Sequence, residues 1–253
     1  MKVALCFAGQ PRYFSENYAY WSNALQGLDV DIFIHAWYDS TDVGTKQGDP
    51  STGTGWTVEP DSDKKIIEMY KPKKSLFQKQ KIFTNEFDEV AKTYFTEDGD
   101  RIWLGAPKVF FSSMFSIKSS VKLMQDYCKE NPKTKYDQVI VTRFDFIYLK
   151  RLNEVLEKDC SSFKTAYVPG DEWNQTHLND VFLVSNYENI VEYSKHFDRW
   201  KEELDNGIAF CPHRLRFAYL KKAGYTFKQI FQFLNYPSRK WFLNRGRGLE
   251  IYC

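Results

Sequence analysis

The segment 137–149, DQVIVTRFDFIYL, is the feature that most restricts what this chain can fold into. Residues 139–141 form a continuous β-branched run, which is typical of a strand buried on both faces of a parallel sheet. Arg143 and Asp145 follow two positions apart, so a strand that continued through them would direct both side chains to one face. Ligands of open α/β sheets bind at the carboxyl ends of the strands. The segment therefore predicts a central strand that ends in a site for a charged ligand.

Two more apolar runs, residues 2–7 and 30–37, predict strands near the amino terminus. Between them, residues 15–28 carry apolar side chains at helical spacing, and Ser15 is of a type that commonly caps a helix. A strand, a helix and a second strand over this length make a βαβ unit. We expect its two strands to be parallel.

The rest of the chain alternates between expected helices and strands. Gly, Ser, Thr, Asp and Pro dominate residues 39–63, which predicts a long loop. Periodicity, capping residues and stop signals predict helices over 63–70, 86–95, 113–130, 186–204 and 211–224, and strands over 75–83, 164–169, 180–185 and 225–233.

A length of 253 residues suits one large domain with its own core, and no linker divides the chain. We expect this domain to cover residues 1–235. Residues 236–253 combine four basic residues with aromatic side chains and two glycines, and we interpret them as a C-terminal extension that acts as a lid. A solvated tail without function is the alternative.

Composition argues against several classes of protein. Lys and Arg number 35 against 33 Asp and Glu, and a net charge of +2 argues against a dedicated nucleic-acid binder. The five cysteines are scattered without a close pair, which predicts reduced thiols. No apolar stretch approaches the roughly 20 residues of a membrane span, so we expect a soluble, cytoplasmic protein.

The first two strands also end in residues typical of binding sites. Gly9, Gln10 and Arg12 follow the first strand; the glycine permits a positive φ, and the arginine offers a fixed fork of donors for phosphate. His35 and Trp37 end the second strand and would reach the same edge of the sheet. An ordinary turn with a surface arginine, and a histidine packed beside a tryptophan in the core, are the alternatives.

Asp145, at the third strand end, could hold a divalent cation through its oxygens and leave positions open for phosphate. It is the only carboxylate at this strand end, and Arg143 stands where a second might be, so a salt bridge is the alternative. A buried charge cluster is unfavourable unless water, a metal or a ligand completes it. This end of the strand is therefore consistent with a charged ligand.

Several segments resemble a known enzyme family in their order and approximate spacing. The segments are VALCFAGQPRYF, DVDIFIHAWYD, SMFSIKSSVKLM and YDQVIVTRFDF, and they resemble nucleotide-sugar-dependent glycosyltransferases of the GT-A fold, of a bacterial and viral type. Downstream, HLNDVFLVS and FCPHRLRFAYLKKAGY are similar to the Asn-Asp-x-Phe and Pro-Glu-x-x-x-x-x-x-Leu segments of such enzymes. The resemblance covers residues 1–40 and 110–225.

The resemblance implies an α/β fold, GT-A-like and Rossmann-like, with a mixed, mostly parallel sheet flanked by helices. Residues 1–150 would form the half that binds the donor, and residues 151–235 the half that binds the acceptor. Residues 143–145 occupy the position of the Asp-x-Asp-type motif, so Asp145 would hold Mn²⁺ or Mg²⁺ on the donor diphosphate. His213, which stands where the family has Glu, would be a second ligand of the metal or of phosphate.

The implied reaction moves a sugar from a nucleoside-diphosphate donor to a hydroxyl of a glycan or glycoconjugate, as in hexosyl- or pentosyltransferases. Its diphosphate leaving group calls for positive charge, which Arg12, Arg143, Lys118 and the cation would supply. Asp180 is the candidate base near the acceptor. Asp171 and Glu172 compete with it for that role.

Two other functions stay open from the sequence. A sulfotransferase would use basic residues without a metal, although no phosphosulfate-binding loop is visible. A carbohydrate-binding protein without catalysis would need aromatic platforms, and Phe, Tyr and Trp make up 17% of the chain. For the transferase, we expect a location in the cytoplasm of a bacterial cell or of a virus-infected host cell, with peripheral membrane contact left open.

Overall fold

The computed structural model describes residues 1–47, 56–86, 88, 106–149, 151–154, 156, 165–169, 182–208, 210, 212–230 and 233–235. Its strands are β1 (Lys2–Gly9), β2 (Asp29–Trp37), β3 (Lys46–Gln47), β4 (Trp56–Thr57), β5 (Lys74–Gln78), β6 (Gln138–Thr142), β7 (Phe146–Tyr148), β8 (Thr165–Pro169), β9 (Phe182–Ser185), β10 (Thr226–Ile230) and β11 (Phe233–Asn235). Its helices are α1 (Phe14–Ala24), α2 (Ser62–Tyr70), α4 (Ala106–Glu130), α5 (Tyr187–Ser194), α6 (His196–Asp205) and α7 (Pro212–Lys222).

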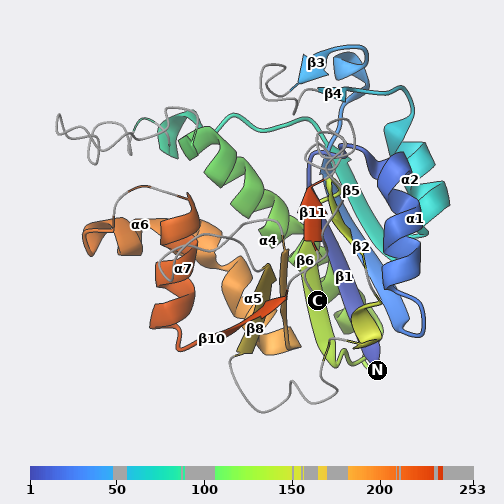
Figure 1. Ribbon diagram of the computed structural model, residues 1–253. Helices are drawn as coiled ribbons and strands as arrows, with labels where there is room; N and C mark the ends of the chain where they lie inside the picture. Colours follow the sequence, from blue (N-terminus) through green and yellow to red (C-terminus); the bar gives the residue numbers. More distant parts are fainter. Residues whose placement is uncertain are drawn as a thin grey trace, which may run out of the picture.

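A mixed, mostly parallel sheet forms the centre of the described structure (Figure 1). Its strand order is β10-β8-β9-β6-β1-β2-β5. The pairs β1–β2, β1–β6, β2–β5 and β8–β10 are parallel, whereas β9 runs antiparallel to both β6 and β8. The expected fold class is therefore confirmed, and one sheet runs through both of the expected halves.

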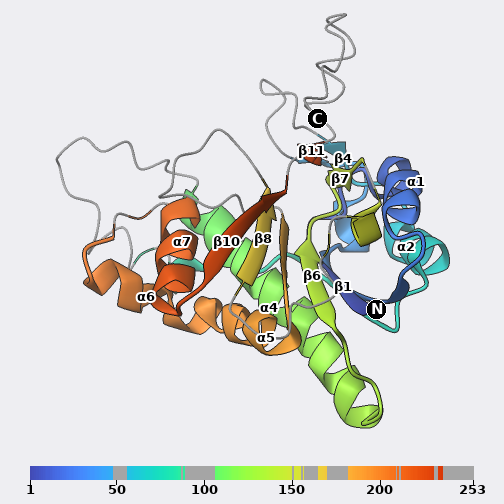
Figure 2. The same cartoon turned by 60° about the horizontal axis from the view of Figure 1, so that its bottom comes forward.

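Helices cover both faces of this sheet, and the alternation of β1 decides which side chains meet them (Figures 1 and 2). Val3, Leu5 and Phe7 pack with residues of α1 and α2. Ala4, Cys6 and Ala8 point to the other face, where they pack with residues of α4. The small side chains on that face let a long helix lie close against the strand, since side chains of a strand alternate between the two faces.

Two helix ends differ from the expected ones. Ser15 lies inside the first turn of α1 instead of capping it; the N-cap is Tyr13, in the left-handed region at φ 55°. Helix α4 begins at Ala106, seven residues before the expected start at residue 113. The longer helix has Pro107 in its first turn, where proline is well tolerated.

The segment 186–204 forms two helices, although periodicity predicts one. Helix α5 is capped by Asn186, whose side chain accepts a hydrogen bond from the Asn189 backbone N–H, and it ends at Ser194. Helix α6 then begins at His196, which is fully buried. Figure 1 shows the two helices at an angle to each other. The break lets α6 follow the core instead of leaving it.

Two small antiparallel pairs complete the described structure. Strands β3 and β4 pair inside the segment 39–63, so the expected loop contains a short hairpin-like sheet. Strand β7 pairs with β11, which brings Asn235 opposite Phe146. The expected helix over 86–95 and the tail over 236–253 lie largely or wholly outside the described residues.

Two further observations concern membrane-spanning helices and the cysteines. Among the described residues, no helix combines the length and the apolar character needed to cross a membrane. Cys6 and Cys128 carry free thiols, as the cysteine spacing predicts for them. The remaining three cysteines, Cys160, Cys211 and Cys253, lie outside the described residues.

Candidate functional site

The ends of four strands meet at one edge of the sheet. The parallel strands β1, β2 and β6 end at Gly9, Trp37 and Thr142. Strand β9 is antiparallel, so it begins at this edge, with Phe182 opposite Thr142. Groups that follow the first three strands or precede the fourth are therefore gathered together, as ligand sites of open α/β sheets require.

Gly9 begins the turn that leaves β1. Its φ is +115°, a conformation that L residues with a side chain rarely adopt, while an added Cβ would meet nothing within 4 Å. Glycine is therefore required here by the backbone conformation and not by lack of space. Three residues on, the Arg12 backbone N–H donates to the Gln10 carbonyl at 2.8 Å.

Arg12, Arg143 and Asp145 form one charged cluster at this edge. Arg143 contacts both oxygens of Asp145, with Nε–Oδ1 at 2.8 Å and Nη2–Oδ2 at 2.5 Å. Arg12 Nη1 lies 3.8 Å from Asp145 Oδ2. The Asp145 side chain is 4% exposed, whereas those of Arg12 and Arg143 are 24% and 27% exposed. Among the described residues, this cluster therefore holds two guanidiniums and one carboxylate.

The charges within the cluster act on the pKa of Arg12. Burial lowers the pKa of Arg12 from its ordinary value; the charge of Asp145 opposes this change, and the charge of Arg143 adds to it. The Arg12 guanidinium therefore lies near a second cation, Arg143, with which it shares the Asp145 carboxylate. A further anion would stabilise the charged guanidinium of Arg12, and a further cation would destabilise it.

Helix α1 and the core hold the turn that carries Arg143 and Asp145. Phe144 stacks on Phe7, with ring centroids 4.6 Å apart. Asn17 Nδ2 donates to the Phe144 carbonyl at 2.7 Å, and Trp21 Nε1 donates to the Phe146 carbonyl at 2.8 Å. Sequence reasoning missed Asn17 and Trp21, because helical periodicity marks them only as residues of a buried face.

The strand expected through residues 143–145 is replaced by a turn, since β6 ends at Thr142 and β7 begins at Phe146. Arg143 and Asp145 nevertheless face each other, but they do so as a bidentate pair within the turn. The salt bridge that was the alternative at this position is therefore present.

Gln10 links the cluster to two neighbouring segments. Its Oε1 accepts a hydrogen bond from Arg12 Nε at 2.8 Å and another from Arg12 Nη2. Its Nε2 donates to Gln47 Oε1 at 2.7 Å and to Gln80 Oε1 at 3.1 Å, and Gln80 Nε2 donates to Ser112 Oγ at 2.9 Å. Sequence reasoning included Gln10 but missed Gln47, Gln80 and Ser112, whose surrounding sequence carries no recognisable signal.

His35 and Trp37 lie inside the protein and not on its surface. His35 is 0% exposed, and both of its ring nitrogens are engaged: Nδ1 with Ser116 Oγ at 2.6 Å and Nε2 with Gln78 Nε2 at 3.0 Å. Since the Gln78 amide is the donor, the imidazole proton lies on Nδ1. Trp37 is 5% exposed and donates from Nε1 to the Ser112 carbonyl at 3.3 Å. Their positions correct the expectation that they line a nucleotide pocket and favour the alternative of a packed core.

The burial of His35 predicts a pH dependence of stability. Burial, with a smaller effect from the charge of Lys81, lowers the pKa of His35 from 6.5 to about 4. Between these two pH values the unfolded chain binds a proton at this histidine that the folded chain does not bind. The contribution of His35 to the free energy of unfolding is therefore complete above pH 6.5 and is lost as the pH falls toward 4. The expected slope is about 1.4 kcal/mol of unfolding free energy per pH unit.

Urea unfolding between pH 6.5 and 5, where few carboxylates titrate, measures this slope. His35→Gln should show a flatter profile than the wild type. A remaining slope is expected from His196, whose pKa burial lowers to about 3. Parallel profiles of the wild type and His35→Gln would contradict the assignment of a neutral, buried imidazole.

Lys118 lies outside the charged cluster. Its Nζ contacts Asp198 Oδ1 at 2.6 Å and lies 5.3 Å from the centroid of the Phe197 ring. These contacts join α4 to α6, on the face of the sheet opposite to α1. This ion pair does not support the expectation that Lys118 faces the diphosphate, which stays a prediction.

The described residues do not fit the expected divalent cation. Asp145 is the one carboxylate of the cluster; Arg143 occupies both of its oxygens, and Arg12 lies nearby. A cation there would meet two positive groups and few oxygen ligands. His213 lies in the first turn of α7, a helix that packs against α6 and α4, and among the described residues no group of three His, Cys, Asp or Glu could hold a metal ion.

The candidate base and its competitors, Asp180, Asp171 and Glu172, lie outside the described residues. Strand β9 begins at Phe182, however, so the chain two residues after Asp180 is held at the same edge as Thr142. The tail over 236–253 follows Asn235, which pairs with Phe146 beside the cluster.

Comparisons with known proteins add little to this picture. No family model matches the chain, and no curated protein matches it. Among solved structures, the chain is similar to mouse xyloside xylosyltransferase 1 in its apo form, with a TM-score of 0.41 and 10% identity over 90% of this chain and 84% of that chain. It is also similar to the galactosyltransferase LgtC in complex with donor and acceptor sugar analogs, with a TM-score of 0.42 and 8% identity over 90% and 73% of the chains. Likeness at this level carries no argument about function.

Proposed function

We propose that this chain is a glycosyltransferase that moves a sugar from a nucleoside-diphosphate donor to a hydroxyl of a glycan or glycoconjugate. The observation that carries the proposal is the cluster of Arg12, Arg143 and Asp145, which among the described residues places two guanidiniums and one carboxylate at the edge where three parallel strands end. The sequence segments that resemble glycosyltransferases, AGQPR and TRFDF among them, supply two of the three strand ends.

The arginines would act on the leaving group. Departure of a nucleoside diphosphate leaves negative charge on its oxygens, and prearranged donors that meet this charge lower the barrier to transfer. Guanidinium groups suit this task, because they stay protonated and bind phosphate oxygens in pairs. Asp145 is a positioning residue in this scheme, since its two oxygens hold the Arg143 fork in place.

We propose that the two arginines meet the donor diphosphate directly. The arrangement around Asp145 supports this assignment, because it favours an added anion over an added cation. The metal-assisted mode expected from the sequence would require Arg143 to release the carboxylate. No step of the proposed reaction depends on such a release.

The proposed function is tested by the binding and turnover of nucleotide sugars. UDP, GDP, CMP and their sugars are screened by thermal shift, because a ligand that binds the folded state raises its stability. Each nucleotide is measured with EDTA and with Mn²⁺, and the expected result is binding that EDTA does not remove. Hydrolysis of the bound nucleotide sugar by the pure protein then distinguishes a transferase from a carbohydrate-binding protein. Stabilisation by a phosphosulfate nucleotide alone would favour a sulfotransferase.

Arg12→Met should weaken the binding of the nucleoside diphosphate by about 10- to 100-fold, because a hydrogen bond to a charged group contributes about 1.5–3 kcal/mol. Isothermal titration calorimetry measures the change. Lys118→Met is a matched control, since it removes the same charge from a residue that pairs with Asp198 instead. An equal loss of affinity in both variants would show a general effect of positive charge and would contradict a specific role of Arg12.

A further inference from the structure

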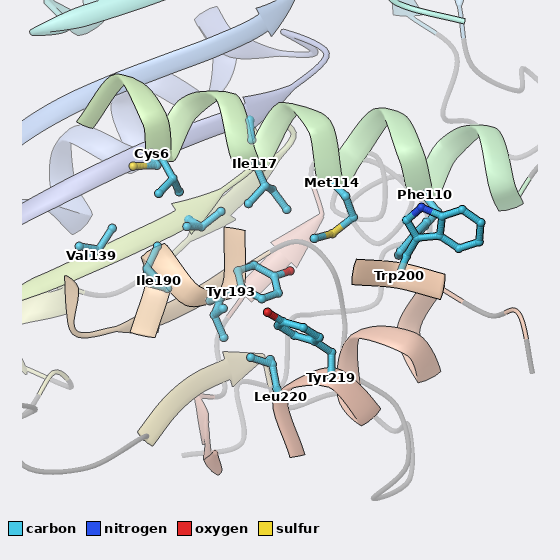
Figure 3. Close-up of a cluster of buried hydrophobic side chains, with 14 of the residues drawn as sticks. Cys6, Phe110, Met114, Ile117, Val139, Ile190, Tyr193, Trp200, Tyr219 and Leu220 are labelled. Atoms are coloured by element: carbon cyan, nitrogen blue, oxygen red, sulfur yellow. The ribbon is translucent and has the colours of Figure 1, made fainter. Parts of the chain in front are cut away.

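A second positive group lies in the core between α4, α5, α6 and α7, apart from the charged cluster at the sheet edge. Arg216 of α7 is only 3% exposed, and His196 at the start of α6 is 0% exposed. Figure 3 shows the surroundings, in which Met114 of α4, Tyr193 of α5 and Tyr219 of α7 come together.

The neighbours of Arg216 give it little compensation for its charge. Its Nη2 lies 3.4 Å from the sulfur of Met114, and its guanidinium lies 5.7 Å from the centroid of the Tyr193 ring. A thioether is a weak acceptor, and a ring face only partly replaces an anion. The buried Nε of Arg216 has no hydrogen-bond partner.

His196 is also buried with nitrogen atoms that have no hydrogen-bond partner. Its ring stacks on Tyr219 at 4.4 Å and meets the edge of Phe110 at 5.5 Å, yet neither of its nitrogens has a hydrogen-bond partner. Burial, with a smaller effect from the nearby charge of Arg216, lowers the pKa of His196 from 6.5 to about 3. The imidazole is therefore neutral, with one N–H donor and one acceptor left unsatisfied.

Three described carboxylates on the neighbouring helices form ion pairs with other residues. Glu192 pairs with Lys195 and Arg199, and Glu203 with Lys222. Asp198 pairs with Lys118. Helix α7 has no acidic residue, and the stretch of α4 that faces it, around Met114, has none either. Arg216 is thus a buried cation without a carboxylate among the described residues.

A buried charge without a partner is strongly unfavourable, and each buried polar atom without a hydrogen bond adds to that cost. We propose that Arg216 and His196 form a second binding site, which takes a single oxyanion, either a carboxylate or a phosphate group. The anion would accept hydrogen bonds from Arg216 Nε and from the imidazole N–H and would neutralise the guanidinium. The proposal does not depend on the chain being a glycosyltransferase.

The test is the response of thermal stability to small anions, without nucleotide and in an Arg12→Met background that weakens the cluster at the sheet edge. Phosphate and acetate are titrated separately, and this comparison identifies the preferred source of the oxyanion. At ten times the Kd, the preferred anion should raise Tm by about 3 °C. Phosphate also stabilises proteins through exclusion from their surface, so the response of an Arg216→Met variant is subtracted.

Arg216→Met should be at least as stable as the parent without added anion, because it removes an unpaired buried charge and keeps the volume. It should lose the specific rise in Tm. Arg214→Met, an exposed change of the same charge on the same helix, should keep the rise. Equal responses of the parent and Arg216→Met, or no response to either anion, would overturn the proposal.

A direct measurement covers the case in which Arg216→Met fails to fold. In the parent, binding of the anion should shift the imidazole resonances of His196, because the neighbouring negative charge raises its pKa and supplies a hydrogen-bond acceptor. His196→Gln identifies these resonances among the four histidines. Resonances of His196 that stay unchanged at saturating phosphate and acetate would exclude the site.

Discussion

Replacing Asp145 with asparagine is expected to lower the free energy of unfolding by about 3 kcal/mol and to weaken nucleotide binding at the same time. Asp145 is 4% exposed at its side chain and lies between two arginines. An amide keeps its size but removes the negative charge, so Arg12 and Arg143 would lose the carboxylate that lies between them. Removal of one partner from a buried pair costs about 3–5 kcal/mol, and the partial exposure of the arginines places this case at the lower end.

Urea unfolding of four proteins measures this effect: the wild type, Asp145→Asn, Arg143→Met and the double variant. The double variant should be more stable than Asp145→Asn alone, because one of the two uncompensated charges is gone, and the cycle gives the coupling of the pair. If Asp145→Asn keeps wild-type stability but loses EDTA-sensitive donor binding, Asp145 is a metal ligand and the direct role of the arginines is wrong.

The strand ends could be predicted from the sequence, because β-branched runs and βαβ spacing determine which residues leave the sheet at the same edge. The burial of His35 and Trp37 could not be predicted from the sequence. Both lie on the face covered by α4, and α4 begins seven residues before its expected start, so Ser112 lies within it and accepts the hydrogen bond from Trp37. Periodicity predicts that a helix exists but does not locate its first turns reliably. Here the first turns of α4 cover the end of β2, so the burial of that strand end depends on them.

The turn at 143–145 shows a second limit of the pattern. Spacing by two places Arg143 and Asp145 on one face of any strand, and the pair does form, but in a turn held by Asn17 and Trp21 from α1. These hydrogen bonds run to backbone carbonyls more than 100 residues away in sequence, so no local pattern reports them. The ion pair was thus predictable as an alternative, and the shape of the turn was not.

The division of 186–204 into two helices has a similar cause. No glycine or proline marks the break, so helical spacing continues through it. The burial of His196 at the start of α6 instead comes from packing against Phe110 and Tyr219, which are distant in sequence. Tertiary contacts of this kind override local propensity.

Asp180→Asn should reduce turnover by about 10²–10⁴-fold while leaving the affinity for the donor nearly unchanged, because this is the usual effect of removing a general base. The role is proposed from the sequence segment HLNDVFLVS. The described part of β9 supports it: Phe182 pairs with Thr142 in antiparallel register, and Thr142 directly precedes Arg143. Phe182, two residues after Asp180 in the chain, therefore lies at the edge where the arginines lie.

Single-turnover kinetics with saturating nucleotide sugar separates the chemical step from donor binding, and the Kd of the nucleoside diphosphate is measured in parallel. Asp171→Asn and Glu172→Gln are the matched controls, because they remove the same function from the two competing carboxylates. A general base is protonated at low pH, so the wild-type rate should fall as the pH drops through the pKa of the group, and Asp180→Asn should lose this acid limb. Asp180 is structural if its variant keeps wild-type turnover, or if it loses donor binding and stability together; a large loss in Asp171→Asn or Glu172→Gln alone would assign the base to that residue instead.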